Sequence, residues 1–192
     1  SIVSTDYLTG AEGAGGSVDI LVSGSGSHLT ATTGMSVGRG VGGTGTVTVS
    51  GGGTLETVSG GLYLEGGSVS TVTGAGSAVH VGTLHSGIPD SWVDADGWLT
   101  LGNASMSVSN GAHVEADGVY VSGHSSGAAS MTVAGSDTTM DGHLLIYVGG
   151  NGNGIVGDGA LTISDGATAT ASVIAAGVDA GTTGRIVLAG AG

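Results

Sequence analysis

Apolar and polar residues alternate along this chain in short runs, and clusters of Gly, Ser, Asn and Asp separate the runs. An alternation with a period of two is typical of a β-strand that buries one side, and the clusters are typical of turns. The pattern favours no helix anywhere in the chain. It therefore predicts an all-β fold built from many short strands.

Seven of these runs are similar to one another, and each reads as a strand followed by a turn that contains Gly. Their equivalent apolar residues are Val22, Val49, Val72, Val108, Val133, Ile163 and Leu188, at intervals of 23 to 36 residues. Self-similarity at such intervals is the signature of a repeat architecture.

Two further strands are predicted in each repeat. The second is anchored at Leu29, Leu55, Val79, Val114, Met140 and Ala169, and the third at Val37, Leu64, Leu101, Val121, Val148 and Ala176. Three short strands cannot bury their apolar sides alone, but coils stacked roughly 4.8 Å apart share a continuous core. We therefore predict one domain, residues 1–192, folded as a single-stranded parallel β-helix (β-solenoid) of six to seven coils. A two-sheet sandwich is the structural alternative.

The composition agrees with this prediction. The chain has 43 Gly, one Pro, no Cys and no Phe, and its mean hydropathy is +0.38. Frequent turns with positive φ account for the glycine, and a narrow core favours small and branched side chains. Lys and Arg total 2 against 15 for Asp and Glu, so the net charge is −13. That charge excludes a nucleic-acid partner, and no apolar run reaches the roughly 20 residues needed for membrane insertion.

Three segments of the repeats resemble those of a known family: TVTVSGGGTLET (46–57), GVYVSGHSSGAASMTVAGS (118–136) and GALTISDGATATA (159–171). They resemble the passenger domains of bacterial autotransporters and the Gly-rich repeats of surface adhesins. The resemblance implies a right-handed parallel β-helix that is secreted and displayed on the surface of a Gram-negative bacterium, where it serves adhesion, aggregation or biofilm formation. Because the chain starts without Met and ends within the repeat, we expect a fragment of a longer surface protein.

The outward positions next to the second anchors predict a column of titratable groups. In order, the column reads Thr30, Glu56, His80, Glu115, Asp141 and Thr170, and His113 is expected to face outward beside Glu115. Neighbours in such a column lie roughly 4.8 Å apart, so Glu56, His80, Glu115 and Asp141 are candidate ligands for calcium or another divalent cation. A solvated polar face with occasional ion pairs is the alternative. No other cofactor is expected.

A second outward column, on the first strands, is rich in hydroxyl groups. It contains Thr48, Thr71, Ser107, Thr132 and Thr162. Such a face suits lateral self-association with another copy of the chain, and Thr ladders also resemble ice-binding faces. Hydroxyl residues are equally common as plain strand formers.

One insertion, residues 82–97, interrupts the repeat. It holds Asp90, Trp92, Asp94 and Asp96, which suit stacking on a sugar ring or contact with a partner. A loop that covers an opening of the core is the alternative.

These features together predict a binding module and not an enzyme: a cell-surface adhesin segment that associates with itself or with a host surface or glycan. A polysaccharide-acting β-helix lyase or glycosidase, with a carboxylate pair drawn from the titratable column, is one alternative. A passive stalk is the other.

Overall fold

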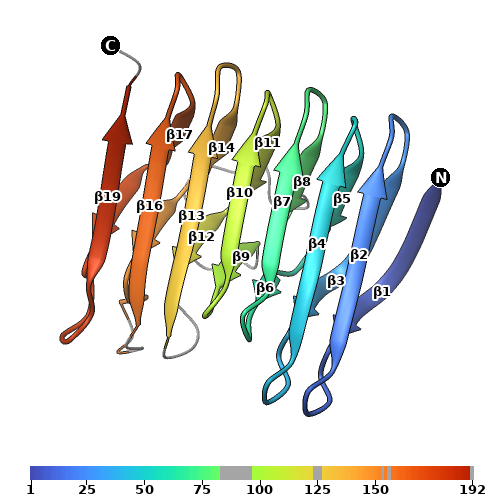
Figure 1. Cartoon of the computed structure of the whole chain (residues 1–192), viewed down its shortest axis with the longest axis horizontal. Coiled ribbons are helices and arrows are strands. Elements are labelled where there is room, and N and C mark those ends of the chain that lie inside the picture. The colour runs from blue at the N-terminus through green and yellow to red at the C-terminus, as the bar shows by residue number, and fades with distance from the viewer. Residues whose placement is uncertain (83–96, 123–126, 153, 155–156, 191–192) are drawn as a thin grey trace.

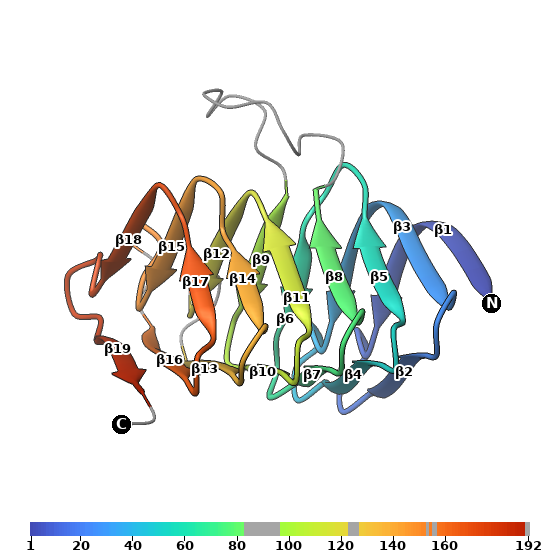
Figure 2. The ribbon, with the colours of Figure 1, turned by 90° about the horizontal axis from the view of Figure 1, so that it is seen from above.

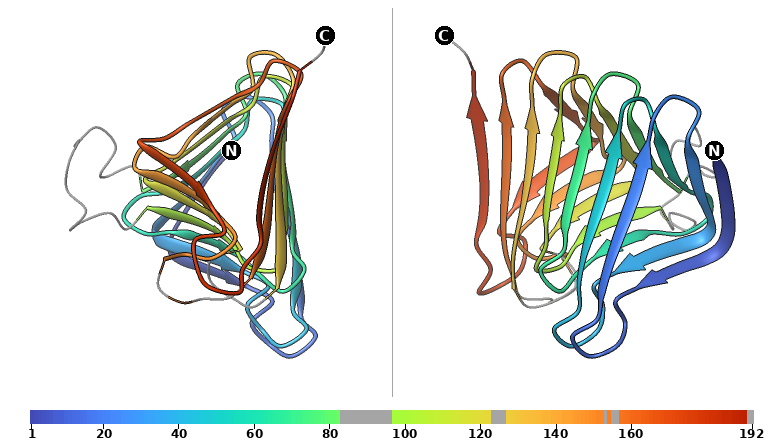
Figure 3. Two further views of the ribbon diagram at one scale, coloured as in Figure 1. Left: turned by 90° about the vertical axis from the view of Figure 1, so that its left-hand side faces the viewer. Right: turned by 45° about the vertical axis from the view of Figure 1, so that its right-hand side comes forward.

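The computed structural model describes residues 1–82, 97–122, 127–152, 154 and 157–190. The described chain contains strands and no helix, and it winds into a solenoid of about six turns. Seen along its axis, the solenoid has a triangular cross-section (Figure 3, left). In Figure 1 the front strands run upward, and the chain returns behind them as it advances from the N-terminal to the C-terminal end, which is a right-handed winding.

The first side of the triangle, here named the hydroxyl face, is a seven-stranded parallel sheet. It consists of β2 (Ser17–Ser23), β4 (Thr44–Ser50), β7 (Val69–Thr73), β10 (Ser105–Ser109), β13 (Ala128–Ala134), β16 (Asp158–Ser164) and β19 (Gly184–Ala189).

The other two sides belong to one folded sheet, because β3 (His28–Val37) and its partner β1 (Ile2–Gly10) run around the corner between them. The histidine face consists of residues 28–31 of β3 with β5 (Thr54–Thr57), β8 (Ala78–Val81), β11 (His113–Ala116), β14 (Thr139–Asp141) and β17 (Thr168–Thr170), which stand in a row in Figure 2. The aromatic face consists of residues 7–10 of β1 and 34–37 of β3 with β6 (Leu62–Leu64), β9 (Trp98–Leu101), β12 (Gly118–Val121), β15 (Leu145–Val148) and β18 (Val173–Ala176).

The register of the three predicted anchor columns is confirmed. Val22 pairs with Val49, Leu55 with Val79, and so on through each series. All pairings among the described strands are parallel, which excludes the antiparallel sandwich. The anchors of the central coils form the lumen, where Leu55, Leu64, Leu101 and Val114 are completely buried. Lumen positions in the last coil are exposed, as at Leu188, because a coil there has a neighbour on one side only.

The corner between the hydroxyl and histidine faces explains much of the glycine content. Each coil turns there through two residues of positive φ, as at Gly51 (φ 60) with Gly52 (φ 83) and at Asn110 (φ 58) with Gly111 (φ 76). Only Gly, and to a lesser extent Asn and Asp, adopts this conformation at low cost.

Among the described residues there is no helix of the length and apolar character that crossing a membrane requires.

Stability should depend on lumen side chains far more than on outward ones. Leu64 is completely buried, so Leu64→Ala should lower the free energy of unfolding by about 2–5 kcal/mol, as lost burial and a cavity add together. Thr132→Ala on the hydroxyl face should change it by less than about 0.5 kcal/mol. Urea unfolding followed by circular dichroism measures both, and equal losses in the two variants would contradict this assignment of the core.

Candidate functional site

The titratable column on the histidine face has the predicted register. In the strand register, Glu56 stands opposite His80, His80 opposite Glu115 and Glu115 opposite Asp141, on the neighbouring strands β5, β8, β11 and β14. These side chains are partly exposed, whereas the alternate residues of the same strands are buried in the lumen. The period of two places the carboxylates and the imidazole on one outward line.

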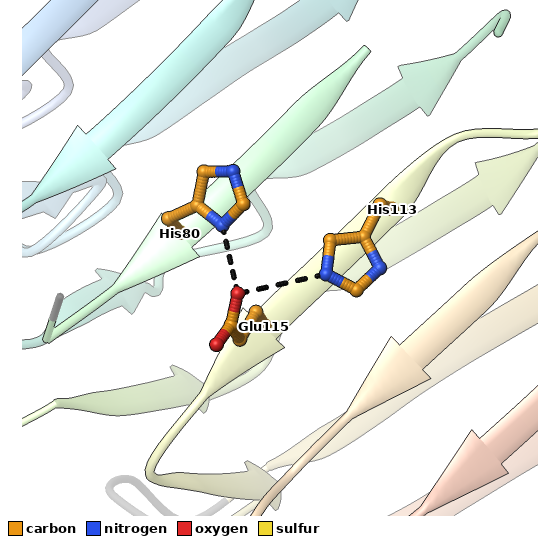
Figure 4. A group of neighbouring side chains, drawn as sticks. All are labelled: His80, His113 and Glu115. Carbon is orange, nitrogen blue, oxygen red and sulfur yellow. Dashed lines mark hydrogen bonds and ion pairs between the residues drawn. The ribbon is translucent and has the colours of Figure 1, made fainter. Parts of the chain in front are cut away.

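The column does not form one continuous cluster, because three imidazoles gather around Glu115. His80 Nδ1 lies 3.1 Å from Glu115 Oε2, and His113 Nε2 lies 3.6 Å from the same oxygen. Figure 4 shows the Glu115 carboxylate between these two rings. On the other side, His143 Nε2 lies 2.9 Å from Glu115 Oε1.

The two remaining acidic members of the column have other partners. Glu56 Oε2 lies 2.9 Å from His28 Nε2, and Asp141 accepts a hydrogen bond of 3.0 Å from the backbone N–H of His143. The sequence did not identify His28 and His143 as part of this group. His28 was detectable, because it stands two residues before the column position of its own strand, whereas His143 lies in a turn that the alternation does not specify.

The predicted hydroxyl column is also in register. Thr48 pairs with Thr71, Thr71 with Ser107, Ser107 with Thr132 and Thr132 with Thr162, and all five side chains face outward and are partly exposed. Further hydroxyls flank the column, and they include Ser50, Thr73, Ser109 and Ser164. The hydroxyl face is therefore a broad sheet surface with very few charges.

Gly82 and Gly97, the two ends of the expected insertion, are described, and the residues between them are not. Gly82 and Gly97 lie so close together that a Cβ atom on Gly82 would meet the Gly97 Cα at 2.3 Å. The buried Asp117 fastens this point, because its Oδ2 accepts a hydrogen bond of 3.1 Å from the Gly97 N–H. The candidate binding residues Asp90, Trp92, Asp94 and Asp96 lie outside the described residues.

The aromatic face carries a cleft that sequence reasoning missed. Every Tyr and Trp side chain that the structure describes belongs to this face: Tyr7, Tyr63, Trp98, Tyr120 and Tyr147. Three of them line a cleft of about 460 Å³. We name it the aromatic cleft, and its lining comprises Tyr7, Tyr63, Trp98, Thr33, Ser36, Arg39, Ser59, Gly60, Gly61 and Glu65.

Two glycines stand in the outward column between the Tyr7 and Trp98 rings. Gly34 pairs with Tyr7 on one side and lies against Gly61 on the other, and the Gly61 Cα position faces the Trp98 carbonyl. A Cβ at Gly61 would meet that carbonyl at 2.7 Å and the Tyr63 ring at 3.0 Å. The two glycines therefore let the backbones of successive coils approach closely between Tyr7 and Trp98. A Gly inside a strand signals such a close approach, so Gly34 was the detectable clue.

A buried hydroxyl without a protein partner also lines the cleft. Ser36 is completely buried, and its Oγ makes no hydrogen bond to the described residues. Leaving a buried polar group unsatisfied costs about 1–3 kcal/mol, so such groups mark positions that water or a ligand completes.

The wall of the cleft is supported by an aromatic row. The Trp98 ring packs over Gly118, and its centroid lies 5.2 Å from that of Tyr120, which in turn lies 5.8 Å from Tyr147. Burial and the neighbouring Tyr147 raise the pKa of Tyr120 above its ordinary value. The row holds the indole at the rim of the cleft.

The glycine-rich turn after β15 surrounds a carboxylate instead of an external ion. Asp179 Oδ2 accepts hydrogen bonds from the N–H groups of Asn151 (2.8 Å) and Gly152 (2.9 Å), and Oδ1 accepts one from Gly154 (3.0 Å). Desolvation acts to raise the pKa of Asp179, but the three backbone donors outweigh it and hold this pKa below its ordinary value of 3.8.

A scan against protein-family models, a search of curated proteins and a search of solved structures each found no match to this chain.

The Asp179 contacts predict a pH-dependent contribution to stability. Because the pKa of Asp179 is lowered in the folded state, folding favours the charged carboxylate. The contribution of this carboxylate to the free energy of unfolding is full above pH 3.8, and it disappears as the pH falls through the folded-state pKa. Asp179→Asn should therefore destabilise the protein at pH 7, and the difference from wild type should shrink below pH 3.8.

Urea unfolding across this pH range tests the prediction. Asp137→Asn, in an exposed turn, is the matched control and should follow wild type throughout. If the stability that Asp179→Asn loses relative to wild type stayed constant with pH, the charge of Asp179 would not contribute to stability.

Proposed function

We propose that this chain is an attachment segment of a bacterial surface adhesin, and that it binds glycans in the aromatic cleft. The observation that carries the proposal is the cleft itself, which Tyr7, Tyr63 and Trp98 line together. The repeats and their resemblance to autotransporter passengers support secretion and display on a Gram-negative cell surface.

The lining has the chemistry that a sugar requires. One face of a pyranose ring is made of C–H groups that pack on an aromatic ring, and its edges carry hydroxyls that need hydrogen-bond partners. Tyr7, Tyr63 and Trp98 supply rings. The Thr33 and Ser59 hydroxyls already donate to backbone carbonyls, so their oxygens can accept hydrogen bonds from a sugar. A volume of about 460 Å³ lies within the range of small-molecule sites, roughly 300–1,000 Å³.

Charge narrows the class of glycan. Arg39 is one of only two cationic side chains apart from His, and it lines the cleft together with Glu65. A net charge of −13 repels polyanionic chains, whereas a single guanidinium suits paired sugar hydroxyls or one carboxylate. The favoured ligands are therefore neutral oligosaccharides and oligosaccharides with one acidic sugar.

The same lining favours binding over cleavage. Glycoside hydrolysis ordinarily uses two carboxyl groups on either side of the scissile bond. Among the described residues that line the cleft, Glu65 is the one carboxylic acid. This favours a lectin-like role over the polysaccharide-acting enzyme.

A second candidate, lateral self-association, is favoured by the hydroxyl face. Its outward columns are aligned over seven parallel strands and carry almost no charge, so two such faces meet without large electrostatic repulsion. Aggregation of cells that display the protein would follow from such contacts. The aromatic cleft lies on another side of the solenoid, so both kinds of contact are compatible.

Removing a wall of the cleft should abolish glycan binding. We expect wild type to bind members of an array of neutral and mono-acidic oligosaccharides, and Trp98→Ala and Tyr63→Ala to lose at least about tenfold in affinity as stacking is removed. Leu21→Ala removes an exposed apolar side chain of β2, on the hydroxyl face, and is the control, which should bind normally. Calorimetry with the best array ligand measures the affinities. Absence of any bound glycan, or unchanged binding by Trp98→Ala, would overturn the proposal.

Charge placed on the hydroxyl face should prevent self-association. Sedimentation velocity of wild type should show reversible, concentration-dependent dimers, and Thr71→Asp/Thr132→Asp should sediment as a monomer because like charges would face each other. The control is Thr168→Asp/Thr170→Asp, which adds the same charge to β17 on the histidine face. A wild type that remains monomeric at all concentrations rules this candidate out.

A further inference from the structure

We propose that His80, His113 and Glu115 form a binding site for a divalent transition metal of the Zn²⁺ class. The site lies on the histidine face, away from the aromatic cleft, and is independent of glycan binding. One donor atom from each residue lies within 4.8 Å of the other two. Two strands supply the ligands, His80 from β8 and His113 with Glu115 from β11.

The two imidazole nitrogens already face the same oxygen of Glu115. Glu115 Oε2 lies 3.1 Å from His80 Nδ1 and 3.6 Å from His113 Nε2, and the two ring centroids are 5.7 Å apart (Figure 4). Ligands of a tetrahedral zinc at about 2.1 Å are separated by about 3.4 Å. The 3.1 Å distance therefore has to lengthen and the 3.6 Å distance to shorten, each by only a few tenths of an ångström. All three side chains are between a quarter and two fifths exposed, so they have room for that movement.

Neighbouring groups orient the ligands. His113 Nδ1 is hydrogen-bonded to Thr139 Oγ1, so its Nε2 is left to face Glu115. A metal-bound imidazole ordinarily has such a partner on its second ring nitrogen, which fixes the tautomer and the ring plane. Glu115 is oriented in the same way, because His143 Nε2 lies 2.9 Å from Oε1 while Oε2 faces the other two imidazoles. We assign His143 as a positioning residue.

The nature of the ligands selects the metal. Two imidazole nitrogens and one carboxylate oxygen suit Zn²⁺, Ni²⁺, Co²⁺ and Cu²⁺, whereas Ca²⁺ requires six to eight oxygen ligands. Glu56 and Asp141 are withdrawn from the site toward His28 and His143. The structure thus favours a transition metal over the calcium that the carboxylates of the sequence column suggested.

In the experiment, the purified wild-type chain is titrated with Zn²⁺. Calorimetry measures the binding, and thermal unfolding measures the stability with and without the metal. We expect binding of one equivalent and a rise in the melting temperature, because a ligand that binds only the folded state stabilises it. Co²⁺ in place of Zn²⁺ should give the visible ligand-field absorption of a nitrogen- and oxygen-ligated site. An excess of Ca²⁺ should not displace either metal.

Variants identify the ligands. His80→Gln, His113→Gln and Glu115→Gln should each weaken Zn²⁺ binding by at least about 100-fold, and His143→Gln by about tenfold with the Co²⁺ spectrum retained, as expected for a positioning residue. The matched control is His28→Gln. It breaks the His28–Glu56 pair of the same face, whose distance of 2.9 Å equals that of the His143–Glu115 pair, and it should bind Zn²⁺ like wild type. Circular dichroism without metal verifies that each variant is folded.

Two results would overturn the proposal. One is the absence of any Zn²⁺-dependent heat, spectrum or stabilisation in wild type, which would leave the cluster as a set of ion pairs. The other is loss of binding in His28→Gln to the same degree as in His113→Gln, which would show nonspecific binding to surface imidazoles.

Discussion

Parallel pairing between successive coils is the constraint on which the rest of the structure depends. A coil of three short strands has no core of its own, so its apolar residues are buried only when the next coil stacks on it in register. Leu55, Val79 and Val114 occupy successive places of one such column and are almost completely buried. A shift by one residue in any coil would expose its lumen residues and bury its outward ones.

The same register organises the surface. Outward residues are repeated at the strand spacing, so each face of the triangle acquires one chemical character from whichever residue types its columns hold. Hydroxyls dominate one face, imidazoles with carboxylates the second, and aromatic rings the third. Because the strands beneath are paired in register, the groups in each column stand at the strand spacing from one another.

Departures from the regular column make the sites specific. Gly34 and Gly61 interrupt an outward column of the aromatic face between Tyr7 and Trp98, where the coils approach closely and the cleft lies. On the histidine face, Glu115 stands where neighbouring coils and its own strand place imidazoles on both sides of it. A solenoid of identical coils would have neither feature, so the irregularities of the repeat carry the candidate chemistry.

The sequence by itself determined the strands of the three anchor series and their register, because apolar and polar residues alternate with the period of a strand and recur from coil to coil. It did not predict β1. It placed Glu56, His80, Glu115 and Asp141 on one line. Only the tertiary structure decided which of these groups meet. His143 reaches Glu115 from a turn whose path no alternation specifies, and Tyr7 and Trp98 stand on strands distant in sequence. Such contacts depend on side-chain direction and on the folding of the sheet around a corner, and neither is encoded by a local pattern.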